Sequence, residues 1–441
     1  MRVLLISSSA RGHAIADALS RSPQKPEIIA VSPSQNPGIH QLAAAQHILE
    51  LSDLEAIVRI AQDAQPDFAI IGPEDPIAAG LADALQKVGV PSVAPMQTLA
   101  RIESSKGFTR DLIAKHGIDS SPLYRVFTEP DADAIHKYIQ DDLQGEYVVK
   151  YDALKGGKGV KVGGEHLDTI DDGVAYAVSC IEECGKVVLE ERLIGEEFSL
   201  ISFVSGTQVI HTPAVQDHKR AYEGDTGPNT GGMGTYSDSD HSLPFITEQD
   251  IKSAQTINEQ VAAALLAETG EPYRGFLYGG FIAVRDDVRV IEYNCRFGDP
   301  EALNILPLLS SDFVAVCQGI VNGTLTDDLV KFDAKATVCM YITPESYPVS
   351  KDQRGQPVAF PTPDANARIY FGDIAEEEDG SLLLGGSRTA GIVGVGNTLT
   401  EAHATALRLC EAVDGPVRFR KDIGSEALIA KRNEAMKRLR S

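Results

Sequence analysis

The segment Val290–Glu301, VIEYNCRFGDPE, contains the residues best suited to chemistry. Apolar residues at and before its start predict a strand, and side chains on a strand alternate between its two faces. Glu292, Asn294 and Arg296 would then point the same way. A carboxylate and an amide oxygen two residues apart suit a hard divalent cation such as Mg²⁺, and the arginine offers a planar fork for phosphate or carboxylate. Taken alone, the motif fits an edge strand with a solvated polar face equally well.

A second candidate is a glycine-rich loop with several lysines that follows a predicted strand, Tyr147–Lys150. Backbone N–H groups of such a loop can close over phosphates, and Lys150 would point at the same phosphates from the strand. The alternative is a glycine-rich hairpin with solvated lysines. The loop residues are Lys155, Gly156, Gly157, Lys158 and Gly159.

Two further stretches are rich in polar residues. An acidic hinge, Glu190–Glu197, lies between the predicted strands Val187–Leu189 and Phe198–Val204. Its backbone could meet a purine edge and Glu197 could accept hydrogen bonds from ribose hydroxyls, whereas an acidic surface loop is the alternative. Farther along, Gln216–Arg220 precedes residues 224–234, which contain five glycines. That composition predicts a long loop, and such loops are usually functional or disordered.

The elements that must position these residues begin with an α/β domain. The apolar run Val3–Ile6, a small-residue turn and the helical stretch Ile15–Leu19 predict a strand, a turn and a helix. Ile28–Val31 and Phe68–Ile71 predict further buried strands of the same sheet.

Two turns at the ends of these strands are candidate binding sites. In an open parallel sheet ligands bind beyond the carboxyl ends of the strands, where Ser7–Gly12 and Glu74 lie. A Rossmann-like dinucleotide site would fit this position, but the turn lacks the GxGxxG fingerprint. A capping box at Ser52–Glu55 predicts the start of one helix, and a second helix is predicted to start at about Ile77.

The remaining elements extend this pattern to the C-terminus. Ser105 and Lys106 open a predicted helix that runs to His116 and stops at Gly117. Phe281–Val284 predicts the strand that precedes Glu292. After about residue 330 the sequence predicts short strands and one helix, at Ala336–Ile342, Ala367–Phe371, Ile392–Gly396 and Thr400–Val413.

Composition limits the classes of partner. The 441 residues predict two or three domains, and a net charge of −23 argues against a nucleic-acid or anionic-membrane partner. Six scattered cysteines suit a reducing cytosol. The N-terminal apolar run fits a first strand better than a signal peptide, and no run approaches the ~20 apolar residues of a membrane span. We therefore expect a cytoplasmic protein.

The order of the motifs adds a further indication. The chain resembles the ATP-grasp ligases, and within them the glycinamide ribonucleotide synthetase (phosphoribosylamine–glycine ligase) family. The resemblance spans nearly the whole chain and is most specific over residues 216–234 and 292–301. The matching segments are GPEDP at 72–76, SKGF at 105–108, KYDALKGGKGV at 150–160, QDHKR at 216–220, DTGPNTGGMG at 225–234, EYNCRFGDPE at 292–301 and RKDIG at 420–424.

This resemblance implies an α/β and α+β multidomain fold. A doubly wound N-terminal domain would cover residues 1–104, an ATP-grasp domain 105–325 with a flexible lid at about 122–190, and a small mixed C-terminal domain 326–441. It also implies that ATP drives the ligation of glycine to 5-phosphoribosylamine through glycyl phosphate, with Mg²⁺ or Mn²⁺ as the metal. Monomer and dimer both remain open.

The resemblance also implies roles for individual residues. Arg296, Asp217 and Lys219 would be catalytic, and Glu292 and Asn294 would hold the metal. The residues that would bind ATP are Lys106, Lys150, Gly156, Gly157, Lys158, Gly159, Glu190, Leu193 and Glu197. Those that would bind glycine and phosphoribosylamine are Ser9, Glu74, Asp217, His218, Lys219, Asn229, Thr230, Gly231, Gly232 and Arg296.

The first turn departs from the family pattern. Ser7–Ala10 is glycine-rich in the family, and Gly12 stands where glutamate is usual. The strand before Glu292 reads GGFIAV, as in this family, and lacks the second metal carboxylate of many other ATP-grasp enzymes. Two alternatives are a sister enzyme that uses formate or bicarbonate in place of glycine, and a nicotinamide-dependent oxidoreductase built on the first domain.

Overall fold

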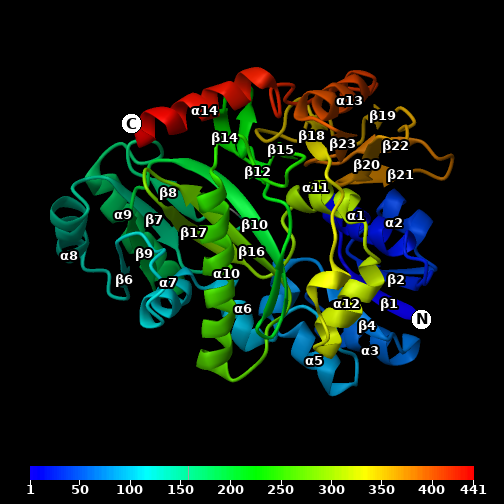
Figure 1. Cartoon of the computed structure of the whole chain (residues 1–441), viewed down its shortest axis with the longest axis horizontal. Coiled ribbons are helices and arrows are strands. Elements are labelled where there is room, and N and C mark those ends of the chain that lie inside the picture. Colours follow the sequence, from blue (N-terminus) through cyan, green and yellow to red (C-terminus); the bar gives the residue numbers. More distant parts are fainter. Residues whose placement is uncertain (157) are drawn as a thin grey trace.

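The computed structural model describes residues 1–156 and 158–441. In Figure 1 an N-terminal sheet lies at the right, a second sheet lies at the left, and a central sheet lies between them. The C-terminal part lies above the N-terminal sheet in the same view. Within the described ranges, no helix has the length and apolar character needed to cross a membrane.

The N-terminal part is a parallel sheet with strand order β3-β2-β1-β4-β5. Leu4 and Ile6 pack into one hydrophobic core, and Val3 and Leu5 pack into another on the opposite face. Burial on both faces accounts for the continuous apolar run of β1 and confirms the predicted doubly wound sheet. The elements are β1 (Arg2–Ile6), α1 (Ser9–Ser20), β2 (Glu27–Ser32), α2 (Pro37–Leu42), β3 (Ala45–Ile48), α3 (Leu54–Ala64), β4 (Phe68–Ile71), α4 (Glu74–Ala78), α5 (Leu81–Lys87), β5 (Ser92–Val93) and α6 (Gln97–Ser104).

One predicted helix cap and one predicted helix start in this part are wrong. The cap of α3 is Asp53 and not the Ser52–Glu55 box, because the Asp53 carboxylate accepts a 2.9 Å hydrogen bond from the backbone N–H three residues later. Helix α4 begins at Glu74, ahead of Ile77. It can do so because Pro76 lies in the first turn, where a missing N–H removes no intrahelical hydrogen bond.

The second sheet, which we call the lid sheet after the predicted lid, has the antiparallel order β6-β9-β7-β8. Its core is separate, with Val149 and Leu189 packed among residues such as Ile139 and Ile181. The lid sheet is therefore a structural unit of its own. The elements of this stretch are α7 (Lys106–Lys115), β6 (Tyr124–Phe127), α8 (Ala132–Lys137), a π-helical turn (Tyr138–Asp142), β7 (Tyr147–Tyr151), β8 (Val160–Val162), α9 (Ile170–Cys184) and β9 (Val187–Glu191).

The central sheet has the antiparallel order β11-β10-β16-β17. Phe198 and Leu200 point into the core that contains α10, whereas Ile201 and Phe203 point into the core that contains α12. Ser199 shares the second face and lines the cleft described below. The elements are β10 (Glu196–Ser205), β11 (Gln208–His211), α10 (Glu248–Thr269), β16 (Arg274–Ala283), β17 (Val288–Asn294), α11 (Glu301–Leu308), α12 (Phe313–Asn322) and a 3₁₀ turn (Asp327–Leu329).

A β-bulge in β17 sets the direction of its polar side chains. The pairing with β16 leaves Ile291 as one extra residue in β17. Val290 before the bulge and Tyr293 after it are both buried in the same core. Glu292 and Asn294 therefore face away from the core and share a face, as predicted. Unbroken alternation from Val290 would have turned Glu292 into the core.

The C-terminal part is an antiparallel sheet with the order β12-β15-β18-β23-β20, and β24 also pairs with β18. β12 and β15 come from the middle of the chain and extend this sheet. The predicted long loop at 224–234 is wrong in part, because Thr226–Asn229 forms a strand that pairs with Arg220–Tyr222. The elements are β12 (Gln216–Asp217), β13 (Arg220–Tyr222), β14 (Thr226–Asn229), β15 (Gly234–Ser237), β18 (Ala336–Pro344), β19 (Pro357–Val358), β20 (Ala367–Phe371), β21 (Ile374–Glu376), β22 (Leu382–Leu384), β23 (Ala390–Gly396), α13 (Leu399–Glu411), β24 (Val417–Arg418) and α14 (Glu426–Arg440).

Candidate active site

A cleft on the open face of the central sheet brings together predicted residues that are distant in the sequence. Glu197 lies on β10, Asp217 on β12 and Glu292 on β17, with Lys219 two residues after Asp217. The complete lining of the cleft is Glu197, Phe198, Ser199, Asp217, Lys219, Tyr278, Gly280, Phe281, Ile291 and Glu292.

Lys150 docks the lid sheet onto the central sheet. Its Nζ lies 2.7 Å from Glu190 Oε2 and donates to the Ile291 carbonyl at 2.8 Å. The bulge displaces this carbonyl from the regular ladder, which leaves it free to accept other donors. Arg110 donates to the same carbonyl at 2.9 Å and binds both oxygens of Glu190, at 2.6 and 2.9 Å. Two cations and one carboxylate therefore join the two sheets.

The charges of this junction are buried and mutually compensated. Burial by itself would raise the pKa of Glu190, but Arg110 and Lys150 outweigh it and lower the pKa to about 2. Burial lowers the pKa of Lys150 by more than Glu190 raises it. Both oxygens of Glu190 are already bonded, and its contact with adenosine stays a prediction. Arg110 was not predicted, because it has no sequence signal beyond its place in an ordinary helix.

Glu292 has the surroundings expected of a metal ligand beside phosphates. Burial raises its pKa, but the positive charges of Lys219, Lys106, Lys150 and Arg296 outweigh burial and lower it, so Glu292 is ionised at neutral pH. In the described part of the chain, no group of three or more His, Cys, Asp or Glu side chains is placed to hold a metal ion. A divalent cation at Glu292 and Asn294 would therefore need further oxygen ligands, which phosphates and water supply.

Lys219 lies among carboxylates that line or border the cleft. Burial opposes its charge, but Glu197, Glu292, Asp217 and Glu301 outweigh burial and raise its pKa. Burial and the neighbouring Glu301 raise the pKa of Asp217 well above its ordinary value. Burial also raises the pKa of Glu301. The Asp217–Glu301 pair therefore holds a proton at a higher pH than free carboxylates would.

Arg296 is held between two acidic side chains. Its Nε lies 3.2 Å from Glu74 Oε2, and its Nη2 lies 3.0 Å from Glu103 Oε1. Glu74 also lies 3.9 Å from Arg11, and Glu103 accepts the Cys295 backbone N–H at 2.8 Å. Two predicted residues, Glu74 and Arg296, are thus brought into contact across 222 positions of sequence. Glu103 was not predicted, because it lies in the last turn of α6 and carries no motif.

The first turn meets the segment after β17 through Asp299. The Ser9 hydroxyl donates to Asp299 at 2.8 Å, and Ser9 has a positive φ of 69°. Tyr341 donates to the other carboxylate oxygen, and Arg388 lies 3.4 Å from it. Burial would raise the pKa of Asp299, but Arg388 and Arg11 outweigh it and lower the pKa. Asp299 belongs to the recognised FGDPE motif, whereas Arg388 has no sequence signal.

His218 lies apart from its neighbours in the QDHKR motif. Asp217 and Lys219 face the cleft, and His218 is buried on the other side of the strand, with Nδ1 3.3 Å from the Gly234 carbonyl oxygen. Burial lowers the pKa of His218 to about 4, so the ring is neutral at pH 7. A direct contact of His218 with substrate stays a prediction.

The predicted substrate loop is held by hydrogen bonds at three consecutive residues, Thr230, Gly231 and Gly232. The Thr230 N–H and hydroxyl donate to the Lys219 carbonyl at 2.7 and 2.9 Å. Arg388 donates to the carbonyls of Gly231 and Gly232 at 2.8 and 3.0 Å. Asn229, at the end of β14, is exposed. These bonds hold the loop beside Asp217, whose carboxylate would lie 2.6 Å from a Cβ added at Gly232.

The remaining predicted ATP residues lie around the lid. Lys106 donates from Nζ to the Ala153 carbonyl at 3.3 Å, at the start of the glycine-rich loop. The Lys158 N–H bonds to the Lys155 carbonyl at 3.1 Å, and Gly156 has a φ of +55°. Gly157 lies outside the described residues. Gly159 packs closely against Tyr151, and Leu193 lies in the short connection between β9 and β10, next to exposed Ile194.

A carboxylate bridges the lid sheet to the β13–β14 hairpin, which we call the substrate hairpin after its predicted role. Glu165 follows β8 of the lid sheet, and its two oxygens lie 2.6 Å from Arg192 and 2.9 Å from Arg220. Arg192 belongs to the hinge, and Arg220 begins β13. Glu165 therefore ties the lid sheet to both the hinge and the hairpin.

Comparison with known proteins covers nearly the whole chain. Three family models match in order: "Phosphoribosylglycinamide synthetase, N domain" over residues 1–103, the ATP-grasp (A) domain over 104–302 and the C domain over 337–426. The chain is 44% identical over 441 residues to a phosphoribosylamine–glycine ligase of Methanocorpusculum labreanum, with 100% of both chains covered. It is 43% identical over 440 residues to that of Methanocella arvoryzae, with the same coverage.

Solved structures agree with these matches. A phosphoribosylamine–glycine ligase from Thermotoga maritima superposes with a TM-score of 0.80 at 28% identity, covering 96% of this chain and 100% of that one. The biotin carboxylase domain of the Hydrogenobacter thermophilus 2-oxoglutarate carboxylase superposes with a TM-score of 0.77 at 13% identity, covering 99% and 97%. The second likeness shows the ATP-grasp fold alone. The three family models match most of the chain in order, and the relatives match its full length. The chain therefore belongs to the phosphoribosylglycinamide synthetase family.

Proposed function

We propose that this chain catalyses the ATP-dependent ligation of glycine to 5-phosphoribosylamine, which gives glycinamide ribonucleotide, ADP and phosphate in purine biosynthesis. The relatives that carry the name phosphoribosylamine–glycine ligase cover the full chain. The observation that carries the chemistry is the position of Glu292, an ionised carboxylate set among Lys106, Lys150 and Lys219. Such a site can neutralise nucleotide phosphates and offers an anionic oxygen for a cation that accompanies them.

The first step is phosphoryl transfer to glycine. A glycine carboxylate oxygen forms a bond to the γ-phosphorus of ATP, the bond from that phosphorus to the bridging oxygen breaks, and ADP leaves. Lys106, Lys150 and Arg296 position and neutralise the phosphates. Mg²⁺ or Mn²⁺ held by Glu292 and Asn294 would supply further charge neutralisation and orientation.

The second step is attack of the amine on glycyl phosphate. The 1-amino nitrogen of phosphoribosylamine forms a bond to the carbonyl carbon, the carbon–oxygen bond to the phosphoryl group breaks, and phosphate leaves. The amine must lose a proton as it reacts. The Asp217–Glu301 pair is suited to accept it, because burial and the neighbouring Glu301 raise the pKa of Asp217 and make its carboxylate a stronger base than a free one.

Lid closure protects this intermediate from water. Residues of about 122–190 act as the lid of an ATP-grasp domain that covers residues 105–325, between an N-terminal domain of residues 1–104 and a C-terminal domain of residues 326–441. Glu165 holds the lid against Arg220 of the substrate hairpin, at 2.9 Å. Excluding water matters because an acyl phosphate hydrolyses readily.

The test is ADP release with each substrate omitted in turn. ADP should form at full rate only with ATP, glycine and phosphoribosylamine together, and glycinamide ribonucleotide should accumulate with it. A Glu292→Gln variant should lose this activity, whereas Arg289→Gln on the same strand should keep it. ADP release sustained by formate or bicarbonate in place of glycine, or tight NAD binding, would overturn the proposal.

A further inference from the structure

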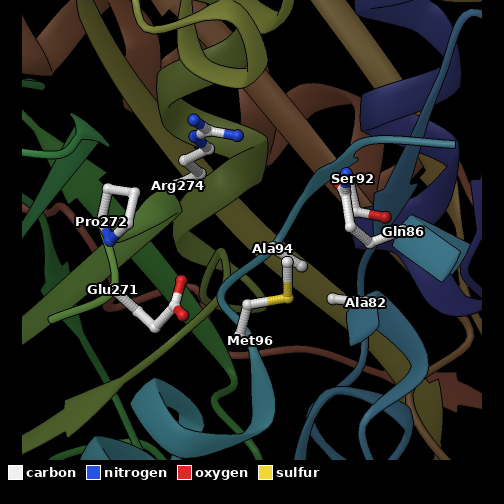
Figure 2. A pocket seen from close by; sticks show the side chains of 8 residues that line it. All are labelled: Ala82, Gln86, Ser92, Ala94, Met96, Glu271, Pro272 and Arg274. Carbon is white, nitrogen blue, oxygen red and sulfur yellow. The ribbon is translucent and has the colours of Figure 1, made fainter. Parts of the chain in front are cut away.

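A second hollow lies where the N-terminal part meets the central sheet, away from the active-site cleft (Figure 2). Its volume of about 360 Å³ is in the range of small-molecule sites. α5 and the stretch around β5 form one side, and the start of β16 forms the other. The lining residues are Ala82, Gln86, Ser92, Ala94, Met96, Glu271, Pro272 and Arg274.

Three polar side chains of this hollow, those of Ser92, Glu271 and Arg274, have no partner among the residues that the structure describes. The Ser92 hydroxyl is buried, the residue being 8% exposed, and it makes no hydrogen bond to any described residue. Glu271 and Arg274 are three positions apart on one rim. Among residues 1–156 and 158–441, neither side chain has an ion-pair partner within 4.0 Å. A buried hydroxyl without a partner costs free energy, so a ligand that bonds to it gains affinity.

The walls of the hollow are held at a fixed spacing. Gly275 follows Arg274, and a Cβ added to Gly275 would lie 3.2 Å from the Cα of Ala94. This backbone contact joins β16 to the stretch after β5, so the two sides of the hollow are positioned before any ligand arrives. A preformed site binds with little cost of reorganisation.

We propose that this hollow binds a free α-amino acid whose side chain ends in a hydrogen-bonding group. Figure 2 shows Arg274 and Glu271 on one side, Ser92 and Gln86 on the other, and Met96 between them. The guanidinium binds the carboxylate of the ligand, and the Glu271 carboxylate binds its ammonium group. The aliphatic part of the side chain packs on Met96, and its polar end bonds to Ser92.

The test is calorimetric titration of the full-length protein with L-glutamine as the probe. Saturating glycine and ADP are present to fill the active site. Two analogues of the same length each lack one charged group: 4-carbamoylbutanoate lacks the ammonium and 4-aminobutanamide lacks the carboxylate. L-norleucine lacks only the amide. Saturable binding of L-glutamine, weaker by roughly tenfold or more for each analogue, is the expected result.

Variants identify the site. Arg274→Gln should weaken L-glutamine binding by roughly tenfold or more, and Ser92→Ala should remove the preference for L-glutamine over L-norleucine. Arg285→Gln, in the exposed turn after β16, is the matched control and should bind normally. The proposal fails if no saturable binding is seen up to about 10 mM, or if Arg274→Gln binds as tightly as the parent. Equal binding of 4-carbamoylbutanoate would also overturn it, because the site would then recognise anions and not amino acids.

Discussion

Replacing Glu103 with glutamine tests whether a buried carboxylate positions Arg296. Glu103 Oε1 lies 3.0 Å from Arg296 Nη2, while Oε2 accepts the Cys295 N–H at 2.8 Å. Glutamine preserves the size of the side chain and an acceptor for Cys295. It replaces the carboxylate oxygen that faces the guanidinium with an uncharged NH2 group, so the variant loses both the charge and the acceptor at Arg296.

The expected magnitude follows from what remains. A hydrogen bond to a charged group contributes about 1.5–3 kcal/mol. Glu74 still pairs with Arg296, at 3.2 Å, so we expect a loss near the lower limit. About 1.5–2 kcal/mol corresponds to a fall of roughly 10–30-fold in kcat/KM. If kcat falls, Arg296 acts on the phosphoryl group during its transfer. If the KM of one substrate rises instead, Arg296 binds that substrate.

The pH dependence of activity separates the loss of this charge from a general loss of stability, because a variant that is only destabilised would keep the acidic limb of the parent. Burial raises the pKa of Glu103 by more than Arg296 lowers it. As pH falls, the parent protein protonates Glu103 and approaches the uncharged state of the Glu103→Gln variant. The parent should therefore lose activity on the acidic side through a step that the variant lacks.

The assay is ADP release at several pH values, with each KM measured and thermal unfolding recorded. Glu268→Gln, which removes a surface carboxylate paired with Lys115, is the matched control. The reasoning is refuted if Glu103→Gln retains the parental kcat, all three KM values and the acidic limb while Arg296→Gln loses activity.

Other predictions concern the lid, the first turn and pH-dependent stability. Lys150→Met should reduce turnover on the order of 10²-fold, and Lys158→Ala should reduce it much less. Equally small effects of the two variants on ADP release would contradict phosphate binding by the strand and glycine-rich loop that contain them. Ser9→Gly should be about 1 kcal/mol more stable than Ser9→Ala, because both lose the bond to Asp299 but only glycine relieves the positive φ; equal urea midpoints would refute this. Burial lowers the pKa of His13 and His218 to about 4, so the unfolded chain binds more protons between pH 4 and 6.5. Each ring then removes on the order of 3 kcal/mol of stability as pH falls through that window, and a His13→Asn variant should lose less over the same range.

Local patterns in the sequence were sufficient to predict a strand or helix where one short stretch of chain contains the whole pattern. The apolar run at Val3–Ile6 is continuous because β1 is buried on both faces, and Phe68–Ile71 is a strand with the predicted limits. The helix after Ser105 begins with that residue as its cap and stops before Gly117, which has a φ of +66°. The shared face of Glu292 and Asn294 was also predictable, although the alternation that predicts it does not show which way that face points.

Tertiary structure decided everything that depends on pairing between distant segments. The bulge at Ile291 turns Glu292 out of the core, and it is a property of the ladder with β16, which the sequence of β17 alone does not reveal. Arg110, Glu103 and Arg388 are ordinary residues in ordinary elements, and only the fold places them within 3.5 Å of site residues separated from them by 80 positions or more. The alternation of side chains follows from the backbone of a single strand, whereas the neutralisation of a buried charge requires a partner from elsewhere in the chain.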